Sequence, residues 1–321
     1  TAGALLSGPT MVTAVGGVAT FGGLSINRAG VGYTLSATSP GLTGAVSQPL
    51  AVAPGPAARL AFTTQPWGAV AGLQFTTQPV VEVQDTFGNT VTASPATVTV
   101  SITPGTGSSG AVLSGTAVVN AVNGVATFSG LAIDKAGVGY TLTATSDSLD
   151  SSFSVPFTVT TAGSNALAFT VQPIGGAAGG PLTLQPVVSV QDAFGNLVSS
   201  STATVTLSIT PASGAAGATL SGVTTVTAAN GVATFNGLRI DRVGAAYTLT
   251  ASSPGLTPAT SRPFTTSGLG RVTDLALRAV DYVDAKNRWA VGLAGTIVMT
   301  NDGGVTWSKQ VSGTTADLYS V

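Results

Sequence analysis

The chain contains neither cysteine nor histidine among its 321 residues. Without cysteine no disulfide can hold a domain together, so each folded unit has to be stabilised by its own hydrophobic core. Without either residue the chain lacks the commonest general base, the commonest metal ligand and the thiolate nucleophile. We therefore predict no enzymatic activity and no cofactor, and we expect a structural role.

Charged side chains are scarce as well. They make up 7% of the residues, the formal net charge is -1, and the eleven Lys and Arg residues are scattered singly. No basic stripe is present to neutralise phosphates, so nucleic acid is not expected as a partner. Long apolar runs are also missing, because Thr, Ser, Gly and Pro interrupt them every few residues. No run approaches the ~18–20 residues that a spanning helix needs, so no membrane span is predicted in this chain.

The sequence does contain a long repeat. The block Gly-Val-Ala-Thr-Phe at residues 17–21 returns at 124–128 and at 231–235, a spacing of 107 residues each time. Such a period is too long for a solenoid unit and is typical of one independent domain. Because residue 1 falls inside a repeat, we expect the natural start to lie upstream. The predicted segments are the second half of a repeat (1–57), two complete repeats (58–164 and 165–267) and a segment of different composition (268–321).

Short runs in which apolar and polar residues alternate predict β-strands in the first complete repeat. The clearest run is Thr-Val-Thr-Val-Ser-Ile, in which Val98, Val100 and Ile102 share one face and the hydroxyl side chains share the other. With 44% apolar residues, the repeats can bury enough surface to fold, and no stretch has helical periodicity. The predicted strands cover residues 59–64, 80–84, 96–102, 117–121, 125–128, 140–145 and 153–160.

Asn-Gly dipeptides predict a tight hairpin between two of these strands in each complete repeat. Asn123-Gly124 and Asn230-Gly231 suit a type I′ turn, because both residues of each pair accept a positive φ.

A longer turn, Asp-x-Phe-Gly-Asn, occupies residues 85–89 and 192–196. The carboxylates of Asp85 and Asp192 are expected to accept hydrogen bonds from backbone N–H groups of the turn. The same two residues are the candidates for a calcium site. Calcium needs about six or more oxygen ligands, however, and each turn offers one aspartate. We therefore favour turn stabilisation over a metal site.

One tyrosine, at Tyr33, Tyr140 and Tyr247, occupies the same place in the three repeats, where we predict that it begins a strand. There a tyrosine can cross the end of a sandwich and hydrogen-bond to the backbone through its hydroxyl, as in a tyrosine corner. The strands, the hairpins and this tyrosine predict an all-β fold of tandem two-sheet Greek-key sandwiches. The repeats resemble the bacterial immunoglobulin-like domains of large surface proteins and invasin-type adhesins, over residues 1–267.

After residue 267, Arg, Asp and Trp become more frequent. Residues 300–307, Thr-Asn-Asp-Gly-Gly-Val-Thr-Trp, resemble the Asp-box (BNR) hairpin, Ser/Thr-x-Asp-x-Gly-x-Thr-Trp. The segment is similar to a blade of the propellers related to photosystem II assembly factors, and residues 318–321 restart the motif of 277–280. The resemblance implies an incomplete β-propeller that continues beyond the last residue. It also implies that Asp302 braces its own hairpin and that Trp307 packs between blade strands.

A catalytic pair of carboxylates is not predicted in this segment. Asp281 and Asp284 are close in sequence, but three residues apart on an extended strand they should face opposite sides.

Three hypotheses for function follow. The first is a non-enzymatic extracellular or cell-surface protein, adhesin-like, in which immunoglobulin-like repeats form a stalk or fibre that displays a propeller module. The second is a subunit of a self-assembling extracellular filament, since a half-sandwich at 1–57 would expose strand edges that another subunit could pair with. The third is a carbohydrate-binding or glycosidase-type propeller protein whose site lies outside this chain. The expected partners are neighbouring copies of the chain or other cell-surface proteins, with glycans as the partner in the third hypothesis.

Overall fold

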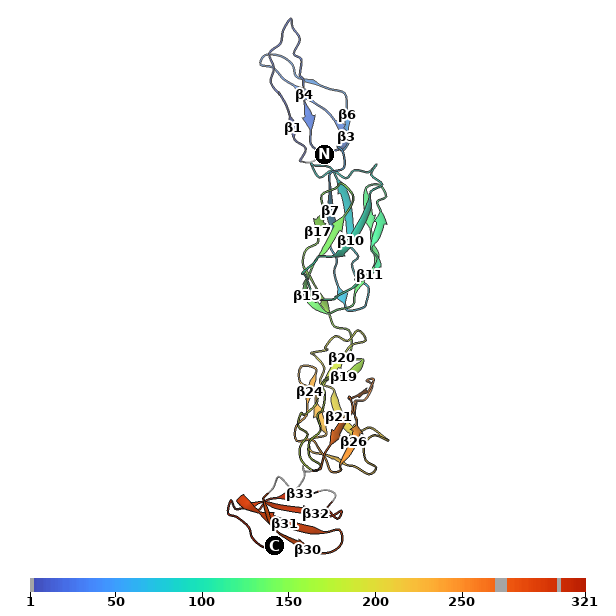
Figure 1. Cartoon of the computed structure of the whole chain (residues 1–321). Helices are drawn as coiled ribbons and strands as arrows, with labels where there is room; N and C mark the ends of the chain where they lie inside the picture. Colours follow the sequence, from blue (N-terminus) through green and yellow to red (C-terminus); the bar gives the residue numbers. More distant parts are fainter. Residues whose placement is uncertain (1–2, 269–275, 305–306) are drawn as a thin grey trace. The chain divides into compact units, whose positions relative to one another are not determined.

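The computed structural model describes residues 3–268, 276–304 and 307–321. These residues form β-strands joined by turns, with one short 3₁₀ helix near the C-terminus. The chain divides into two compact units, Thr1–Thr160 and Thr161–Val321, and each is described by itself (Figure 1). In the part of the chain that the structure describes, no helix is long and apolar enough to cross a membrane.

The first unit holds one complete repeat, coloured from cyan to green in Figure 1. Its strands in chain order are β7 (Arg59–Thr64), β8 (Ala69–Val70), β9 (Val80–Gln84), β10 (Thr97–Ile102), β11 (Leu113–Thr116), β12 (Val118–Asn120), β13 (Val125–Thr127), β14 (Ser129–Ile133), β15 (Gly137–Tyr140), β16 (Leu142–Thr145), β17 (Ser152–Phe153) and β18 (Phe157–Thr160).

These strands form a two-layer sandwich. The larger sheets have the orders β13-β9-β7 and β12-β10-β16-β17, and the smaller ones are β11-β14 and β15-β18-β8. All pairs are antiparallel except β18 with β8. Neighbours such as β10 and β16 are far apart in the chain, so connections pass between the sheets, as in a Greek key. The predicted all-β sandwich is therefore confirmed.

The core follows from the alternation that the sequence shows. Val98 and Val100 of β10 are buried, whereas Thr97 and Ser101 on the other face are exposed. From the opposite sheet β9 buries Val81, and all of these valines belong to one core cluster. Fully burying one valine contributes roughly 1.5–3 kcal/mol, so several such positions per strand can stabilise a domain that has no disulfide.

The strand boundaries differ from the prediction in two places. Tyr140 ends β15 instead of beginning a strand, because the chain changes sheets between Tyr140 and Leu142. The predicted strand at 153–160 is two strands, β17 and β18, in different sheets. Pro156 lies between them and lacks the N–H group that would continue a ladder. Strands β8, β11, β14 and β15 were missed because they are short or contain glycine, and so show no clear alternation.

The first unit also contains the N-terminal repeat. Its strands form three separate antiparallel pairs, namely β1 (Leu6–Ser7) with β2 (Ser25–Ile26), β3 (Gly30–Tyr33) with β6 (Leu50–Val52), and β4 (Ser36–Ala37) with β5 (Ala45–Val46). On the period of 107 residues they correspond to β11, β14, β15, β18, β16 and β17. Within residues 3–57 no strand corresponds to β7, β8, β9 or β10.

The second unit begins with another sandwich. Its sheets are β19-β20-β24, β23-β21-β27-β28, β22-β25 and β26-β29, and they enclose one core cluster. The strands are β19 (Ala166–Val171), β20 (Val187–Gln191), β21 (Thr204–Ile209), β22 (Leu220–Ser221), β23 (Thr225–Thr227), β24 (Val232–Thr234), β25 (Arg239–Ile240), β26 (Gly244–Tyr247), β27 (Leu249–Ser252), β28 (Ala259–Thr260) and β29 (Phe264–Thr266).

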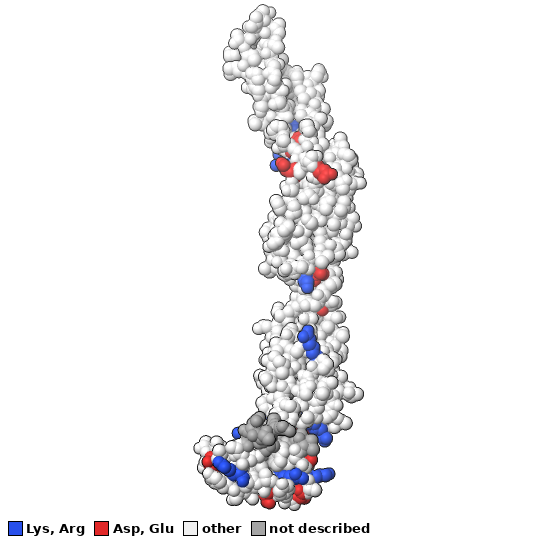
Figure 2. Space-filling model, in the orientation of Figure 1, with Lys and Arg blue, Asp and Glu red and all other residues white. Residues whose placement is uncertain are grey.

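The C-terminal segment forms one four-stranded antiparallel sheet. Its strands follow chain order and are β30 (Leu277–Tyr282), β31 (Arg288–Gly292), β32 (Ile297–Thr300) and β33 (Ser308–Gln310), with the 3₁₀ helix η2 (Leu293–Gly295) between β31 and β32. Residues 318–321, which were predicted to restart the first strand's motif, form no strand. On the face drawn in Figure 2, charged side chains gather on this sheet, and the sandwich repeats have wide uncharged areas.

Candidate functional sites

The turn after β9 is the first candidate site. Asp85 is buried, and its Oδ1 accepts hydrogen bonds from the backbone N–H groups of Phe87 and Asn89, both at 2.9 Å. Its Oδ2 accepts hydrogen bonds from the Asn89 side chain at 2.8 Å and from the N–H of Gly55 at 2.9 Å. Gly88 has a φ of +83°, which glycine adopts without strain. Asp85 therefore fixes both its own turn and the segment that leads into the repeat.

These contacts determine the pKa of Asp85. Burial raises the pKa, but the hydrogen bonds from Asn89, Gly55 and Phe87 outweigh burial and lower the pKa from 3.8 to about 2. The carboxylate is therefore ionised at neutral pH and holds no proton that it could donate in catalysis. A cation would have to displace the N–H donors that surround both oxygens, which argues against calcium at Asp85. Within the described ranges no three His, Cys, Asp or Glu side chains are grouped so that they could hold a metal.

Asn89 extends from this turn to the N-terminal repeat. Its Nδ2 donates a hydrogen bond to the carbonyl oxygen of Asn27, and its Oδ1 accepts one from the N–H of Ala29, both at 2.9 Å. One side-chain amide thus pairs with the backbone of the other repeat in the way that a peptide group of a neighbouring strand would. The donor and the acceptor it meets also fix the orientation of the amide. We call Asp85, Asn89, Asn27, Ala29 and Gly55 the repeat joint.

The loop that Asn89 contacts is itself held in place. The Oδ1 of Asn27 accepts a hydrogen bond from the N–H of Leu5 at 2.8 Å. At the corresponding position of the complete repeat, Asp134 accepts one from the N–H of Val112 at 2.7 Å. A short side chain with an acceptor oxygen therefore fixes this loop in both repeats, so the backbone groups of Asn27 and Ala29 are held in position for the joint.

Sequence reasoning identified the turn but gave Asn89 no role. The turn itself requires an acceptor at Asp85 and a positive φ at Gly88, and neither requirement explains an asparagine at its last position. The available signal was the return of that asparagine as Asn196, because the residue recurs in the other complete repeat without a local reason.

The corresponding turn of the second unit has the same internal geometry. The Oδ1 of Asp192 accepts hydrogen bonds from the N–H groups of Phe194 and Asn196, both at 2.9 Å. Its Oδ2 accepts from the Asn196 side chain at 2.9 Å and from the N–H of Ala162 at 3.2 Å. Burial raises the pKa of Asp192, and these hydrogen bonds lower it further than burial raises it. Asp192, like Asp85, ties the turn to the segment that enters its repeat.

The three tyrosines lie at equivalent positions. The hydroxyls of Tyr33, Tyr140 and Tyr247 donate hydrogen bonds to the carbonyl oxygen five residues upstream, at 3.0, 2.9 and 3.0 Å. Tyr140 and Tyr247 are fully buried. Gly107 and Gly214 pack against these two rings and leave no room for a Cβ atom. Each tyrosine therefore closes one end of its repeat by joining the core to a backbone loop.

The Asn-Gly dipeptides adopt the backbone that their residues favour. The φ angles are 51° and 75° for Asn123 and Gly124, and 50° and 75° for Asn230 and Gly231. An antiparallel bridge flanks each dipeptide. In the first unit the strands on either side, β12 and β13, belong to different sheets, so this hairpin joins the two layers of the sandwich.

In the C-terminal sheet the candidate residues also act locally. The hydroxyl of Thr300 donates a hydrogen bond to the Oδ1 of Asp302 at 2.7 Å and accepts one from the N–H of Gly304 at 2.9 Å. These contacts brace the turn that follows β32. Trp307 is partly buried. Residues 305 and 306 of the predicted Asp box lie outside the described residues.

The prediction that Asp281 and Asp284 share one extended strand is wrong. Strand β30 ends at Tyr282, and Asp284 lies in the next turn, where its Oδ1 accepts hydrogen bonds from the N–H groups of Lys286 and Asn287, both at 2.7 Å. The Asn287 side chain and these N–H groups lower the pKa of Asp284. The strand ends early because an aspartate that can accept several backbone N–H groups favours a turn.

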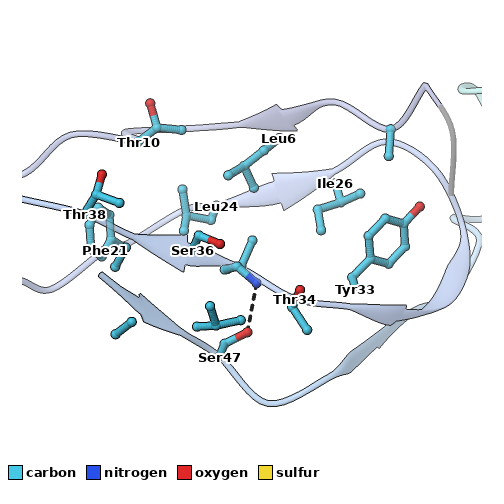
Figure 3. Close-up of a pocket in the computed structure, with 15 residues that line it drawn as sticks. Leu6, Thr10, Phe21, Leu24, Ile26, Tyr33, Thr34, Ser36, Thr38 and Ser47 are labelled. Carbon is cyan, nitrogen blue, oxygen red and sulfur yellow. Dashed lines mark hydrogen bonds between the residues drawn. The ribbon is translucent and has the colours of Figure 1, made fainter. Parts of the chain in front are cut away.

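The second candidate site is an apolar face of the N-terminal repeat. A cavity of about 590 Å³ lies along it (Figure 3). Leu6, Leu24, Ile26 and Tyr33 line the cavity together with Phe21. The cavity contains no charged side chain, and the only charged residue at positions 1–57 is an arginine outside the lining. We call these five residues, together with Leu35, the open face.

The complete repeats show the same face covered. Phe21 is 40% exposed, whereas its equivalents Phe128 and Phe235 are 1% and 0% exposed. Tyr33 is partly exposed, and its equivalent Tyr140 is fully buried. The difference arises because β7, β9 and β10 supply the opposite side of the core in the complete repeat.

Comparisons with known proteins add little to this description. No protein-family model matches the chain, and no curated protein matches it. Among solved structures, extracellular domains 3-5 of Drosophila OTK are 13% identical, with 77% of this chain and 76% of that chain covered and a TM-score of 0.27. The titin domains z1z2 in complex with telethonin are 14% identical, with 67% and 100% covered and a TM-score of 0.21. The Parabacteroides merdae β-glucuronidase is 14% identical, with a TM-score of 0.23. The alignment covers 63% of this chain but only 23% of the enzyme. Such values support no inference about function, and the fold rests on the strand pairing and the cores.

Proposed function

We propose that this chain is part of a non-enzymatic extracellular structural protein. In this proposal the immunoglobulin-like repeats serve as a stalk, and the four-stranded C-terminal sheet is a blade of a propeller that the stalk displays. The partners are other cell-surface molecules or neighbouring copies of the chain.

The observation that carries the proposal is the repeat joint. A stalk has to transmit position and force from one domain to the next, which a flexible linker cannot do. In the first unit, Asn89 makes two hydrogen bonds to the N-terminal repeat, and Asp85 holds the linker at Gly55. Side chains of one repeat are thus used to fix its neighbour, which is a feature of a structural element.

The chemistry of the acidic side chains also supports a structural role. Asp85, Asp192 and Asp284 each accept several N–H groups and have a lowered pKa. A general acid needs a pKa near the working pH, usually raised by burial or by a like charge. These carboxylates are shifted in the opposite direction, as expected for groups that stabilise turns.

Surface labelling of the source cells tests the proposed location. We expect antibodies against residues 58–267 to label intact cells, and external protease to remove that signal without lysis. Labelling that requires permeabilised cells would contradict an extracellular stalk. An antibody against a cytoplasmic enzyme of the same cells is the control for intactness.

The open face favours the filament as a second candidate function. A half-sandwich with an uncovered apolar face and an unpaired strand edge is the acceptor that strand complementation requires. Electron microscopy of the purified full chain tests this function directly, because filaments should form without other components. Glycan recognition by a complete propeller stays a prediction.

A further inference from the structure

The open face is complementary to a known set of strands, because the chain contains two complete copies of the same sandwich. The equivalents of Leu24, Ile26 and Leu35 are Leu131, Ile133 and Leu142, which are all 0% exposed. They lie in one core with residues of β7, β9 and β10. The face is therefore already formed as one half of a core, and its missing side has a defined shape and chemistry.

The edge of the adjoining sheet is open in the same place. In the complete repeat β16 pairs with β17 on one side and with β10 on the other, where Val100 lies opposite Ala144. In the N-terminal repeat the corresponding strand β4 pairs with β5 alone in the described structure. An incoming strand would thus gain both a ladder of backbone hydrogen bonds along β4 and an apolar surface for every second side chain.

We propose that the open face is a strand-acceptor site whose occupant is a polypeptide equivalent to β9 and β10, supplied by a separate chain. The occupant presents valine at alternate positions to the face and hydroxyl side chains to solvent, as Val98 and Val100 alternate with Thr97 and Ser101 in the complete repeat. The register follows from that repeat and places the equivalent of Val100 opposite Ala37. This inference rests on the filament as the second candidate function and specifies its contact.

Two other occupants fit less well. A second copy of this chain already uses its own β9 and β10 in its sandwiches, so donating them would require one of its repeats to open. A charged or strongly polar ligand would find no charged group in the lining and would lose hydration against the leucines and Phe21. A donor with unpaired alternating strands satisfies both the edge of β4 and the apolar face.

Peptide binding to the full chain tests the proposal. The probe is a synthetic peptide with the sequence of residues 78–103, titrated into the 321-residue chain by calorimetry. We expect one site per chain, and slower amide hydrogen exchange at residues 35–38 when the peptide is bound. Replacing both Val98 and Val100 of the peptide by Asp should weaken binding at least about tenfold, because two charges would enter the core. The matched peptide with Thr97→Asp and Ser101→Asp should bind within about threefold of the parent, because those side chains face solvent.

Variants of the chain provide a second control. Leu35→Asp should abolish binding, whereas Val31→Asp should retain it, because Val31 is 83% exposed and its equivalent Val138 is 75% exposed even in the complete sandwich. The peptide variants keep the test valid if Leu35→Asp unfolds the N-terminal repeat. Equal affinities for the two substituted peptides, or no binding of the parent peptide, would overturn the proposal. So would a dimer of the unliganded chain that Leu35→Asp dissociates in sedimentation, since the occupant would then be a second copy. None of these results depends on surface labelling or on filament formation, so the functions and the contact can fail separately.

Discussion

Replacing Asn89 by alanine should loosen the repeat joint without opening the core of the complete repeat. The substitution removes the hydrogen bonds to the carbonyl of Asn27 and from the N–H of Ala29, both of 2.9 Å. Each such bond contributes about 1 kcal/mol net, so the closed arrangement should lose about 2 kcal/mol. This value corresponds to a roughly 30-fold decrease in the ratio of closed to open molecules. Water can reach both backbone groups after the substitution, which keeps the cost from rising further.

The absence of cysteine makes the measurement direct. Spin labels at Ser39→Cys in the N-terminal repeat and Ser109→Cys in the complete repeat are unique in this chain, and both positions are exposed. We expect a narrow distance distribution by pulsed dipolar spectroscopy in the parent, and a clearly broader one with Asn89→Ala. Asn120→Ala is the matched control, because Asn120 is hydrogen-bonded only to Thr97 of its own repeat in the described structure.

The reasoning fails if Asn89→Ala leaves the distance distribution unchanged while urea unfolding shows an intact complete repeat. The urea measurement is needed because Asn89 also donates to Asp85 at 2.8 Å, so the substitution removes one contact inside the turn as well. A broadening shared equally by Asn120→Ala would point to a general loss of order and would count against the joint.

Three further predictions concern the first unit. Tyr140→Phe should lower the free energy of unfolding by about 1 kcal/mol in urea titrations, because it removes one hydroxyl hydrogen bond from a buried ring; an unchanged midpoint would mean that the bond contributes nothing. Gly124→Ala should destabilise by more than about 1 kcal/mol, because a Cβ there would lie 2.5 Å from a backbone oxygen at a φ of +75°, whereas Gly105→Ala, at a φ of +78° in open space, should cost less by thermal melting. Asp85 has a folded pKa of about 2, below its unfolded value of 3.8, so its contribution to stability should be complete above about pH 4 and lost as the pH falls through about 2. Asp85→Asn should flatten this part of the acid unfolding curve, and an unaltered curve would show that another group is responsible.

Much of the sandwich could be predicted from local patterns. The alternation around Val98 and Val100 indicated a strand with one buried face, and β10 begins within one residue of the prediction and ends where predicted. The prediction failed where the chain changes sheets. Tyr140 was expected to begin a strand and instead ends β15, because alternation shows that a residue is buried but not which sheet it belongs to.

The candidate sites were less predictable than the fold. The role of Asp85 in its turn follows from the sequence of five residues, since the carboxylate and the N–H groups that it accepts are neighbours. The reach of Asn89 to Asn27 and Ala29 spans 62 and 60 residues of sequence, and no local rule connects them. The pairing of Asp281 with Asp284 failed for the same reason in reverse, because competition between a strand and a turn depends on which N–H groups are free nearby.

The sequence alone determined the period of 107 residues, the faces of the strands and the type I′ turns, because each depends on residues close together in the chain. The tertiary structure decided which strands pair, that one asparagine holds the neighbouring repeat, and that the face around Leu24 and Tyr33 lies open. These outcomes depend on which distant segments meet, and the free energy of such meetings is distributed over core contacts and backbone hydrogen bonds that no short stretch of sequence contains.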